Sequence, residues 1–349
     1  MKNHNTLINY YNGRRVLVTG GASFIGSHLC ELLSRSGAFV RVVDDLSSGK
    51  LENLSKVIND IEFLRGDMRD PAVARLACEQ QSVVFHLAAS HGGRGYIETH
   101  PVECVNNILL DHQVFHAAAH ASAEKIIFAS SACVYPTTLQ SDETNRLQLK
   151  ETDANFEECG KAFSDGEYGW SKLISEMQLR AFHKQFGIQG VACRIFTAYG
   201  ERENESHAVI ALIAKAAAKM DPYPIWGSGY QTRNFTYVAD TVMGLALSGA
   251  KLTDFEVINI GSSTHHTIIE LIDEIFKYIT WAPKEIEKQL DKPVGVKSRS
   301  SDNAKSLRCL EWEPGCTLAD GVGRTVDWYL SQVTNKQLTN LDHLLMERA

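Results

Sequence analysis

Short, nearly continuous apolar runs alternate with segments of helical periodicity through the first two hundred residues, and no other feature limits the possible folds as strongly. Six runs end in small or polar residues and are expected to be buried strands; they cover 16–20, 39–45, 61–67, 83–89, 125–131 and 191–197. Helical periodicity is clear between them, for example over 27–36 and 101–120. This order predicts an α/β fold with a doubly wound parallel sheet and helices on both faces. Ligands of such sheets bind at the carboxyl ends of the strands, so the residues after each run are functional candidates.

The alternation becomes irregular beyond residue 200. We expect a helix over 207–219, a strand over 255–261 and another helix over 267–279. The predicted organisation is therefore a first, sheet-forming domain over 14–200, with later segments free to return to it. A smaller, partly discontinuous C-terminal lobe over 201–330 would close over the sheet edge and bind mainly the substrate, and a polar tail would cover 331–349.

Composition excludes several classes of protein. The 349 residues are 44% hydrophobic and 22% charged, which suits a globular chain with a sizeable core. A formal net charge of −7 gives no electrostatic basis for nucleic-acid binding, and no apolar run approaches the ~20 residues of a membrane helix. The 8 cysteines are scattered without a C-x-x-C pair, so we expect reduced thiols and no metal site. Together with a polar N-terminus, these features predict a cytoplasmic protein.

A glycine-rich turn, T-G-G-A-S-F-I-G over 19–26, follows the first strand and opens a helix. Glycines at such a turn let the backbone approach a pyrophosphate, which the helix N-terminus stabilises. Ser23 stands where the motif usually has its middle glycine, and a serine fits there if its backbone angles are ordinary. Alone, the pattern also suits a plain strand–helix turn. The expected cofactor contacts are Gly20, Ser23, Phe24, Ile25 and Gly26.

Three further strand ends carry compatible chemistry. Asp44 and Asp45 end the second run, where a carboxylate can accept the hydroxyls of an adenosine ribose and would repel a 2′-phosphate. Asp67 ends the third and can meet the adenine amino group, with Met68 beside it. The fourth run ends in Leu87, Ala88 and Ala89, small residues at a point where a dinucleotide must pass. Together these ends predict a Rossmann domain that binds NAD in preference to NADP.

A tyrosine and a lysine stand four residues apart in Y-G-W-S-K, so Tyr168 and Lys172 lie on one helix face. A lysine ammonium beside a phenol lowers the phenol pKa from about 10, and such a tyrosine can take a proton from an alcohol while hydride leaves the carbon. Ser131, at the end of the fifth run, can hydrogen-bond the same alcohol. Alone, Y-x-x-x-K is common and often structural; after a dinucleotide fold it becomes specific.

The set of T-G-x-x-x-x-x-G, Asp44, L-A-A, Ser131 and Y-x-x-x-K resembles the extended short-chain dehydrogenase/reductases, which act on nucleotide sugars. The resemblance runs from about 16 to 330. Within this family, three stretches are most similar to GDP-mannose 3,5-epimerases: G-G-R-G-Y-I over 92–97, S-S-A-C-V-Y-P over 130–136 and W-G-S-G-Y-Q-T-R-N-F-T over 226–236. A fourth, R-S-S-D-N over 299–303, resembles the segment with a diphosphate-binding arginine.

The resemblance assigns roles to further residues. It implies that Cys133 is an acid/base on a sugar C–H, although a lone cysteine after a buried strand also suits a small core residue. It implies that Lys172 holds the nicotinamide ribose. His207 lies near the position of the second acid/base, a lysine in the 3,5-epimerases, and histidine suits proton transfer near neutrality. The implied substrate contacts are Gly93, Arg94, Ser131, Cys133, Thr197, Trp226, Gln231, Arg233 and Arg299.

Two departures bear on the substrate. Thr197 stands where the family commonly has asparagine, and the segment over 155–167 is longer than usual and is expected near the sugar. Both are compatible with a substrate other than GDP-mannose. Ala132 and Cys133 occupy the positions of the Asp-Glu pair of 4,6-dehydratases, which argues against dehydration.

These features favour an NAD-dependent nucleotide-sugar epimerase that works through a transient 4-keto sugar with proton exchange at C3, C5 or both. The expected partners are a GDP-, UDP- or dTDP-hexose and, by family resemblance, a second copy in a homodimer. The nearest alternative is a 4-epimerase of UDP-glucose or UDP-glucuronate, which needs no second acid/base pair. A 4,6-dehydratase and an NAD-sensing regulatory protein fit less well. The sequence leaves open the base, the sugar and the carbon that is inverted.

Overall fold

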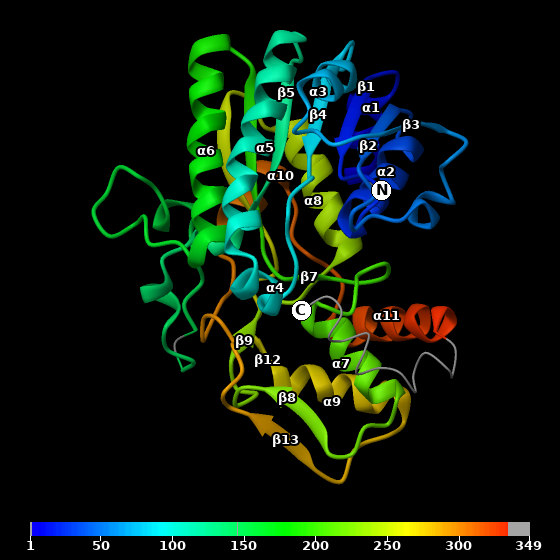
Figure 1. Ribbon diagram of the computed structural model, residues 1–349, viewed down its shortest axis with the longest axis vertical. Coiled ribbons are helices and arrows are strands. Elements are labelled where there is room, and N and C mark those ends of the chain that lie inside the picture. Colours follow the sequence, from blue (N-terminus) through cyan, green and yellow to red (C-terminus); the bar gives the residue numbers. More distant parts are fainter. Residues whose placement is uncertain (1, 145, 334–349) are drawn as a thin grey trace.

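A parallel seven-stranded sheet forms the centre of the molecule, in the order β11-β6-β5-β4-β1-β2-β3 (Figure 1). The computed structural model describes residues 2–144 and 146–333. The strands of this sheet are β1 Arg15–Thr19, β2 Phe39–Asp44, β3 Ile61–Arg65, β4 Val83–His86, β5 Lys125–Ser131, β6 Gln189–Ile195 and β11 Phe255–Ile260. All six expected strands are present, and the doubly wound α/β class is confirmed.

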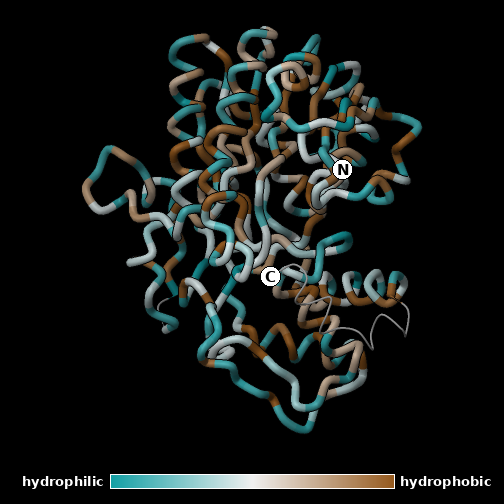
Figure 2. Tube along the Cα trace, viewed as in Figure 1, coloured by the Kyte–Doolittle hydropathy of each residue, from teal (hydrophilic) through white to brown (hydrophobic). Residues whose placement is uncertain are grey.

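Helices cover both faces of the sheet because its strands are apolar on both sides. In β1, Val16 and Val18 face one core cluster and Leu17 the other, as the two-residue period of a strand requires. The first cluster holds residues of α1 Lys2–Tyr11, α2 Phe24–Arg35 and α8 Val238–Lys251; the second holds residues of α3 Pro71–Cys78, α5 Pro101–His120 and α6 Gly166–Phe186. In Figure 2, hydrophobic positions gather between these layers and hydrophilic ones mark the outer loops.

A smaller lobe lies beyond the carboxyl ends of the strands (Figure 1). It contains α7 Ala208–Ala217, β8 Tyr223–Trp226, α9 Ile268–Ile279, β13 Ile286–Gln289 and α11 Leu318–Gln332. Short pairs and connections complete the chain: β7 Ala198–Tyr199, β9 Thr232–Arg233, β10 Thr236–Tyr237, β12 His266–Thr267, α4 Arg94–Thr99, α10 Ala304–Leu310 and the 3-10 turns Leu51–Leu54, Ala132–Val134, Thr137–Gln140 and Glu151–Asp153.

Some segments after residue 200 belong to the central sheet. The expected strand over 255–261 is β11, which pairs in parallel with β6 at the sheet edge, and α8 packs on the face below it. Of the expected polar tail, 331–332 continue α11, and 334–349 lie outside the described residues. Within the described part of the chain, no helix is long and apolar enough to cross a membrane.

Candidate active site

A cavity of about 1850 Å³ opens between the carboxyl ends of the strands and the smaller lobe. Every site residue expected from the sequence lines it except Gly26. The parallel sheet explains this convergence, because strands that run in one direction end at one edge. The residues that line the cavity extend from Asp44, at the end of β2, to Trp226 in the smaller lobe.

The glycine-rich turn is shaped by close backbone contacts. Gly20 has a φ of +69°, and a Cβ there would lie 2.9 Å from the Ala88 backbone. A Cβ on Gly26 would lie 2.2 Å from the Gly20 carbonyl oxygen, so this glycine serves the packing of α2 on the turn. Ser23 has ordinary angles, φ −86° and ψ −178°, so a serine fits. The backbone at the N-terminus of α2 is therefore open to a ligand, and a Cβ at Gly20 would disturb this turn. A pyrophosphate needs such an open backbone in order to bind at a helix N-terminus.

The carboxylate at the end of β2 is buried and held by backbone amides. Asp44 Oδ2 accepts from Ala22 N and Oδ1 from Leu46 N, both at 2.9 Å. Burial raises the pKa of Asp44, and these amides act against that shift. Since a carboxylate oxygen can accept more than one hydrogen bond, both oxygens retain capacity for ribose hydroxyls.

Asp67 is engaged by a neighbour that the sequence interpretation did not consider. Arg69 Nε lies 3.0 and 2.9 Å from its two oxygens, and Arg69 Nη2 lies 2.7 Å from Oδ2. The arginine lowers the pKa of Asp67. An adenine amino group would therefore share this carboxylate with Arg69; that contact stays a prediction.

Tyr168 and Lys172 both face inward from α6, but the expected effect of the lysine on the phenol is wrong for this structure. Burial raises the pKa of Tyr168 well above 10, with a hydrogen bond to Ser131 acting in the lowering direction. Lys172 Nζ lies 5.9 Å from the Tyr168 ring centroid and 3.9 Å from Asp111 Oδ2. The ammonium is therefore directed to a carboxylate and does not offset the burial of the phenol.

Asp111 was missed by the sequence analysis and organises the floor of the site. It lies in α5 with 0% exposure, and its Oδ1 is 2.8 Å from His86 Nε2. His86 Nδ1 in turn lies 2.7 Å from Thr19 Oγ1. Although burial opposes ionisation, Lys172 and His86 hold the pKa of Asp111 below its ordinary value. A carboxylate between apolar positions of a long helix was the signal that could have identified it.

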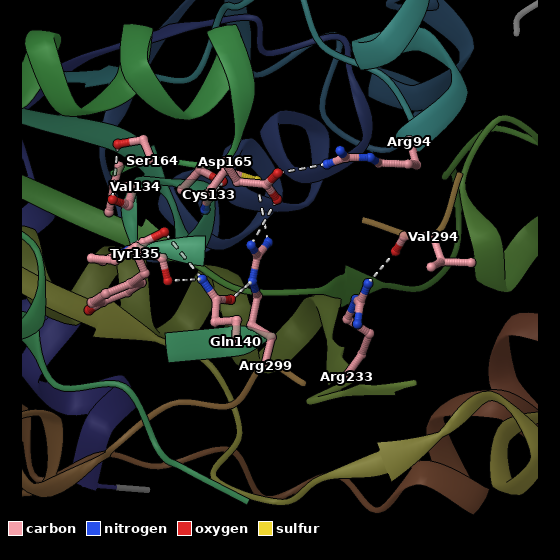
Figure 3. A network of polar contacts seen from close by, with 12 residues as sticks. Arg94, Cys133, Val134, Tyr135, Gln140, Ser164, Asp165, Arg233, Val294 and Arg299 are labelled. Carbon is pink, nitrogen blue, oxygen red and sulfur yellow. Dashed lines mark hydrogen bonds and ion pairs between the residues drawn. The ribbon is translucent and has the colours of Figure 1, made fainter. Parts of the chain in front are cut away.

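Cys133 lies in a network of polar contacts (Figure 3). Its backbone N donates to Ser131 Oγ at 3.1 Å, and Arg299 Nη1 donates to its sulfur at 3.3 Å. The same guanidinium donates through Nη2 to Asp165 Oδ2 at 3.0 Å and through Nε to Gln140 Oε1 at 2.6 Å. Arg299 thus contacts the candidate acid/base directly, which the sequence did not predict; its role toward a diphosphate stays a prediction.

Asp165 joins two arginines immediately before α6. Its Oδ1 accepts from Arg94 Nη1 at 2.9 Å, while Oδ2 binds Arg299. Burial opposes ionisation, yet the two guanidinium groups lower the pKa of Asp165. Of the described residues 155–167, expected near the sugar, only Asp165 lines the cavity. Most of the others are exposed, in a loop that Figure 1 shows projecting from the body of the molecule, whereas Ser164 is buried.

The lobe residues that face the cavity have internal roles as well. Gln231 Nε2 donates to Trp226 O at 2.8 Å and its Oε1 accepts from Gly229 N at 2.9 Å, so the amide fixes this turn. Arg233 donates to the carbonyls of Thr232 and Val294, both at 2.8 Å. Burial and the neighbouring Arg299 lower the pKa of Arg233 to about 10. Thr197 lines the cavity beside the end of β6.

His207 is the residue directly before α7 and faces the cavity. Its Nδ1 lies 3.3 Å from Glu203 Oε1, and burial lowers its pKa to about 4. On its other side lies His91, with ring centroids 5.1 Å apart, and the His91 ring is 5.4 Å from that of Tyr168. His91 was missed because only the fold brings 91, 168 and 203–207 together, and Glu203, which stands four positions before His207, was missed as well.

Comparisons with known proteins agree with this site. A family model described as "NAD dependent epimerase/dehydratase family" matches residues 16–261. GDP-mannose 3,5-epimerase 1 from Oryza sativa subsp. indica is 31% identical over 94% of this chain and 85% of its own length. A putative UDP-glucose 4-epimerase from Methanocaldococcus jannaschii is 29% identical over 90% and 97%. The structure of UDP-glucuronic acid 4-epimerase from Bacillus cereus, in complex with UDP-4-deoxy-4-fluoro-glucuronic acid and NAD, is 29% identical, covers 91% of this chain and 100% of its own, and has a TM-score of 0.77.

Proposed function

The chain belongs to the NAD dependent epimerase/dehydratase family, whose members include nucleotide-sugar epimerases, and from this premise we propose that it epimerises a nucleotide sugar through a 4-keto intermediate with proton exchange at C3, C5 or both. The observation that carries the proposal is the convergence of a tyrosine, a cysteine and a histidine on one cavity: Tyr168, Cys133 and His207. The first suits oxidation of an alcohol, and the other two suit proton exchange at carbon.

NAD is the cofactor of this family, and it supplies a hydride acceptor when bound. The turn at Gly20 and the α2 N-terminus suit its pyrophosphate, and Asp44 suits the adenosine ribose. Lys172, paired with Asp111, would hold the nicotinamide ribose at the end of the site where Tyr168 stands.

The chain's own residues then divide the proton chemistry. Tyr168, with Ser131 as its hydrogen-bond partner, takes the proton of the sugar C4 hydroxyl in its ionised form, which the positive charge of bound nicotinamide would favour. The C4 ketone acidifies the hydrogens on C3 and C5. Cys133 removes or returns such a proton, and Arg299 Nη1 donates to its sulfur at 3.3 Å, which fixes its position in the cavity. His207 serves as the second acid/base.

A plain 4-epimerase is the second candidate, because a UDP-glucose 4-epimerase of similar identity is among the relatives. Such an enzyme needs Tyr168, Lys172 and Ser131 but has no use for Cys133 or His207 as acid/base groups. The contact between Arg299 and the Cys133 sulfur supports the 3,5-exchange proposal over this alternative. The absence of an Asp-Glu pair at Ala132 and Cys133 argues against a dehydratase.

Deuterium incorporation separates the two candidates. The holoenzyme is given GDP-, UDP- and dTDP-hexoses in deuterated water, and deuterium is located in the recovered sugars. The proposal expects deuterium at C3 or C5, and Cys133→Ser should lower its incorporation about 10²–10⁴-fold while oxidation at C4 persists. Cys159→Ser, at an exposed cysteine away from the cavity, is the matched control. Inversion at C4 without deuterium, with Cys133→Ser fully active, would establish the 4-epimerase instead.

The proposed assembly is a homodimer formed through α5 and α6. These helices pack against each other, and α5 exposes Val102, Val105 and Leu109 at helical spacing, with Leu109 67% exposed. Trp170 and Met177 are exposed on α6. Sedimentation velocity should give a dimer that Leu109→Glu converts to a monomer, whereas Leu76→Glu on α3 should leave it intact. A monomeric wild type would contradict this assembly.

A further inference from the structure

The Asp165 side chain stands at a helix N-cap without capping the helix. Asp165 is the residue directly before α6, and at that position a carboxylate ordinarily accepts a hydrogen bond from a backbone amide of the first turn. Here the side chain makes no such bond. Its two oxygens instead accept from Arg94 Nη1 and Arg299 Nη2, at 2.9 and 3.0 Å (Figure 3). A capping role therefore does not account for this buried carboxylate.

The backbone at this position is bound to the turn that carries Cys133. Asp165 N donates to Cys133 O at 2.8 Å, and Ser164 Oγ donates to Val134 O at 3.1 Å. A Cβ on Gly169 would lie 2.2 Å from Cys133 O, so a larger residue there would push the first turn of α6 away. These contacts do not use the Asp165 carboxylate. A substitution of its side chain therefore leaves α6 attached to the cysteine turn.

The Arg299 guanidinium is fixed on three sides. Its Nε donates to Gln140 Oε1 at 2.6 Å, its Nη1 to the Cys133 sulfur at 3.3 Å and its Nη2 to Asp165. Gln140 is itself held, because its Nε2 donates to two backbone carbonyls of the preceding turn. Of the three partners, Asp165 is the carboxylate. Arg299 is only 8% exposed, and a buried charge needs such a counter-charge.

Two more guanidinium groups surround the same carboxylate. Arg94 binds its other oxygen, and Arg233, which donates to two backbone carbonyls, lies close enough to Arg299 to repel it. Without Asp165, the three cations would repel one another across this wall of the cavity. Arg299 has the least exposure of the three, so it would have to move toward water and away from the Cys133 sulfur.

We propose that Asp165 is a positioning residue for the proton exchange at carbon, because it holds Arg299 against the Cys133 sulfur; this role rests on the proposed function. A cysteine side chain has three staggered rotamers, and the bond from Arg299 favours the one observed. Tyr168 is held by other contacts, namely the backbone of α6 and the hydrogen bond to Ser131. Asp165 therefore acts on the exchange step and leaves the oxidation at C4 unchanged.

The first experiment compares the two steps in the holoenzyme. GDP-, UDP- and dTDP-hexoses are supplied in deuterated water, the absorbance of the reduced nicotinamide is followed, and deuterium at C3 and C5 is measured in the recovered sugar. Asp165→Ala removes both bonds to the guanidinium groups and keeps the amide that binds Cys133 O. We expect deuterium incorporation to fall about 10–100-fold, the cost of displacing a reacting group by ~1 Å, while reduction of the nicotinamide changes less than about three-fold.

Two further variants separate positioning from loss of charge. Asp165→Asn keeps one acceptor oxygen, which can serve Arg299 alone. It should therefore retain more exchange than Asp165→Ala, although both variants remove the same charge. Asp327→Ala is the matched control, because it removes an exposed carboxylate that accepts from the Tyr278 hydroxyl at 2.7 Å outside the cavity. It should change neither step.

Arginine side-chain NMR tests the position of Arg299 without any substrate. In holoenzyme made with isotope-labelled arginine, a planar guanidinium that is bonded at all three nitrogens rotates slowly and gives separate Nη–H signals, whereas a free one gives averaged signals. The Arg299 signals are identified by their loss in Arg299→Lys. They should be separate in the wild type and in Asp327→Ala, and averaged in Asp165→Ala.

The outcomes separate the two proposals. If the wild type gains no deuterium at C3 or C5, the proposed function is wrong, and the Arg299 signals alone decide whether Asp165 holds that side chain. If the wild type exchanges and Asp165→Ala keeps the exchange, or loses exchange and oxidation in equal measure, the positioning role is overturned. A selective loss of exchange, larger in Asp165→Ala than in Asp165→Asn and accompanied by averaged Arg299 signals, supports it.

Discussion

At the scale of single residues, Lys172 shows how a distant neighbour redirects a charge. Its spacing from Tyr168 suggests that its ammonium stabilises a phenolate, and the sequence offers no reason to think otherwise. The fold brings Asp111 within 3.9 Å of that ammonium from a helix 61 positions earlier. A buried carboxylate attracts the cation more strongly than a neutral phenol does. Lys172 is therefore shared with Asp111, and its charge alone does not offset the burial of the Tyr168 phenol.

Replacing Tyr168 with phenylalanine tests this view of the phenol. The ring packing is retained, while the hydroxyl that takes the sugar proton is lost. We expect substrate affinity to survive and reduction of the bound dinucleotide to fall about 10²–10⁴-fold. Isothermal titration with a nucleotide sugar and single-turnover absorbance measure the two quantities. Near wild-type turnover would show that Tyr168 and Lys172 are a structural pair.

At the scale of elements, local patterns predicted the pieces, and long-range contacts decided how they meet. The six strands and the helix over 101–120 were predicted from periodicity. A strand buried on both faces gives a continuous apolar run, and a helix buried on one face gives an apolar residue every three or four positions. The place of β11 at the edge of the central sheet was not, since sheet order depends on pairing with β6 across some 60 residues. Asp165 was missed for the same reason, because its partner Arg299 becomes a neighbour only through the fold. Glu203 stands four positions before His207, so its spacing was a signal that could have identified it.

The contact between the segment at Gly93 and the segment before α7 is an element-scale feature with a sharp test. Gly93→Ala would place a methyl group 1.9 Å from the Ser206 carbonyl oxygen, so the two segments must separate. We expect about 1–3 kcal/mol of lost stability and a loss of activity, because His91 and His207 would move apart. Gly315→Ala, where nothing lies within 4 Å of the added Cβ, is the control. Urea unfolding measures the stability, and an unchanged midpoint and rate for Gly93→Ala would contradict the packing argument.

At the scale of the whole molecule, buried ionisable groups gather around the cavity at the edge of the sheet. Asp111, Lys172, Asp165, Arg299 and Glu203 are all buried there, and a smaller number, such as the Arg194–Glu176 ion pair, are buried elsewhere. Burying such groups costs free energy that a purely structural core would avoid. The stability of the molecule should therefore depend on pH through its buried ionisable groups.

His207 contributes a pH dependence of folding that a single substitution can isolate. Its pKa is about 4 in the folded protein, against about 6.5 in an unfolded chain. Above pH ~6.5 neither state binds the proton, and the folded state keeps its full stability. As the pH falls from ~6.5 toward 4, only the unfolded state takes up the proton, so stability declines by at most about 1.4 kcal/mol per pH unit from this group. Urea unfolding at about pH 7.5, 6.5, 5.5 and 4.5 spans this window. The free energy of unfolding should decline with falling pH in the wild type, and the decline should be shallower in His207→Gln. Equal declines in the two proteins would mean that His207 is protonated as easily in the folded state as in water, and that its burial beside Glu203 does not hold in solution.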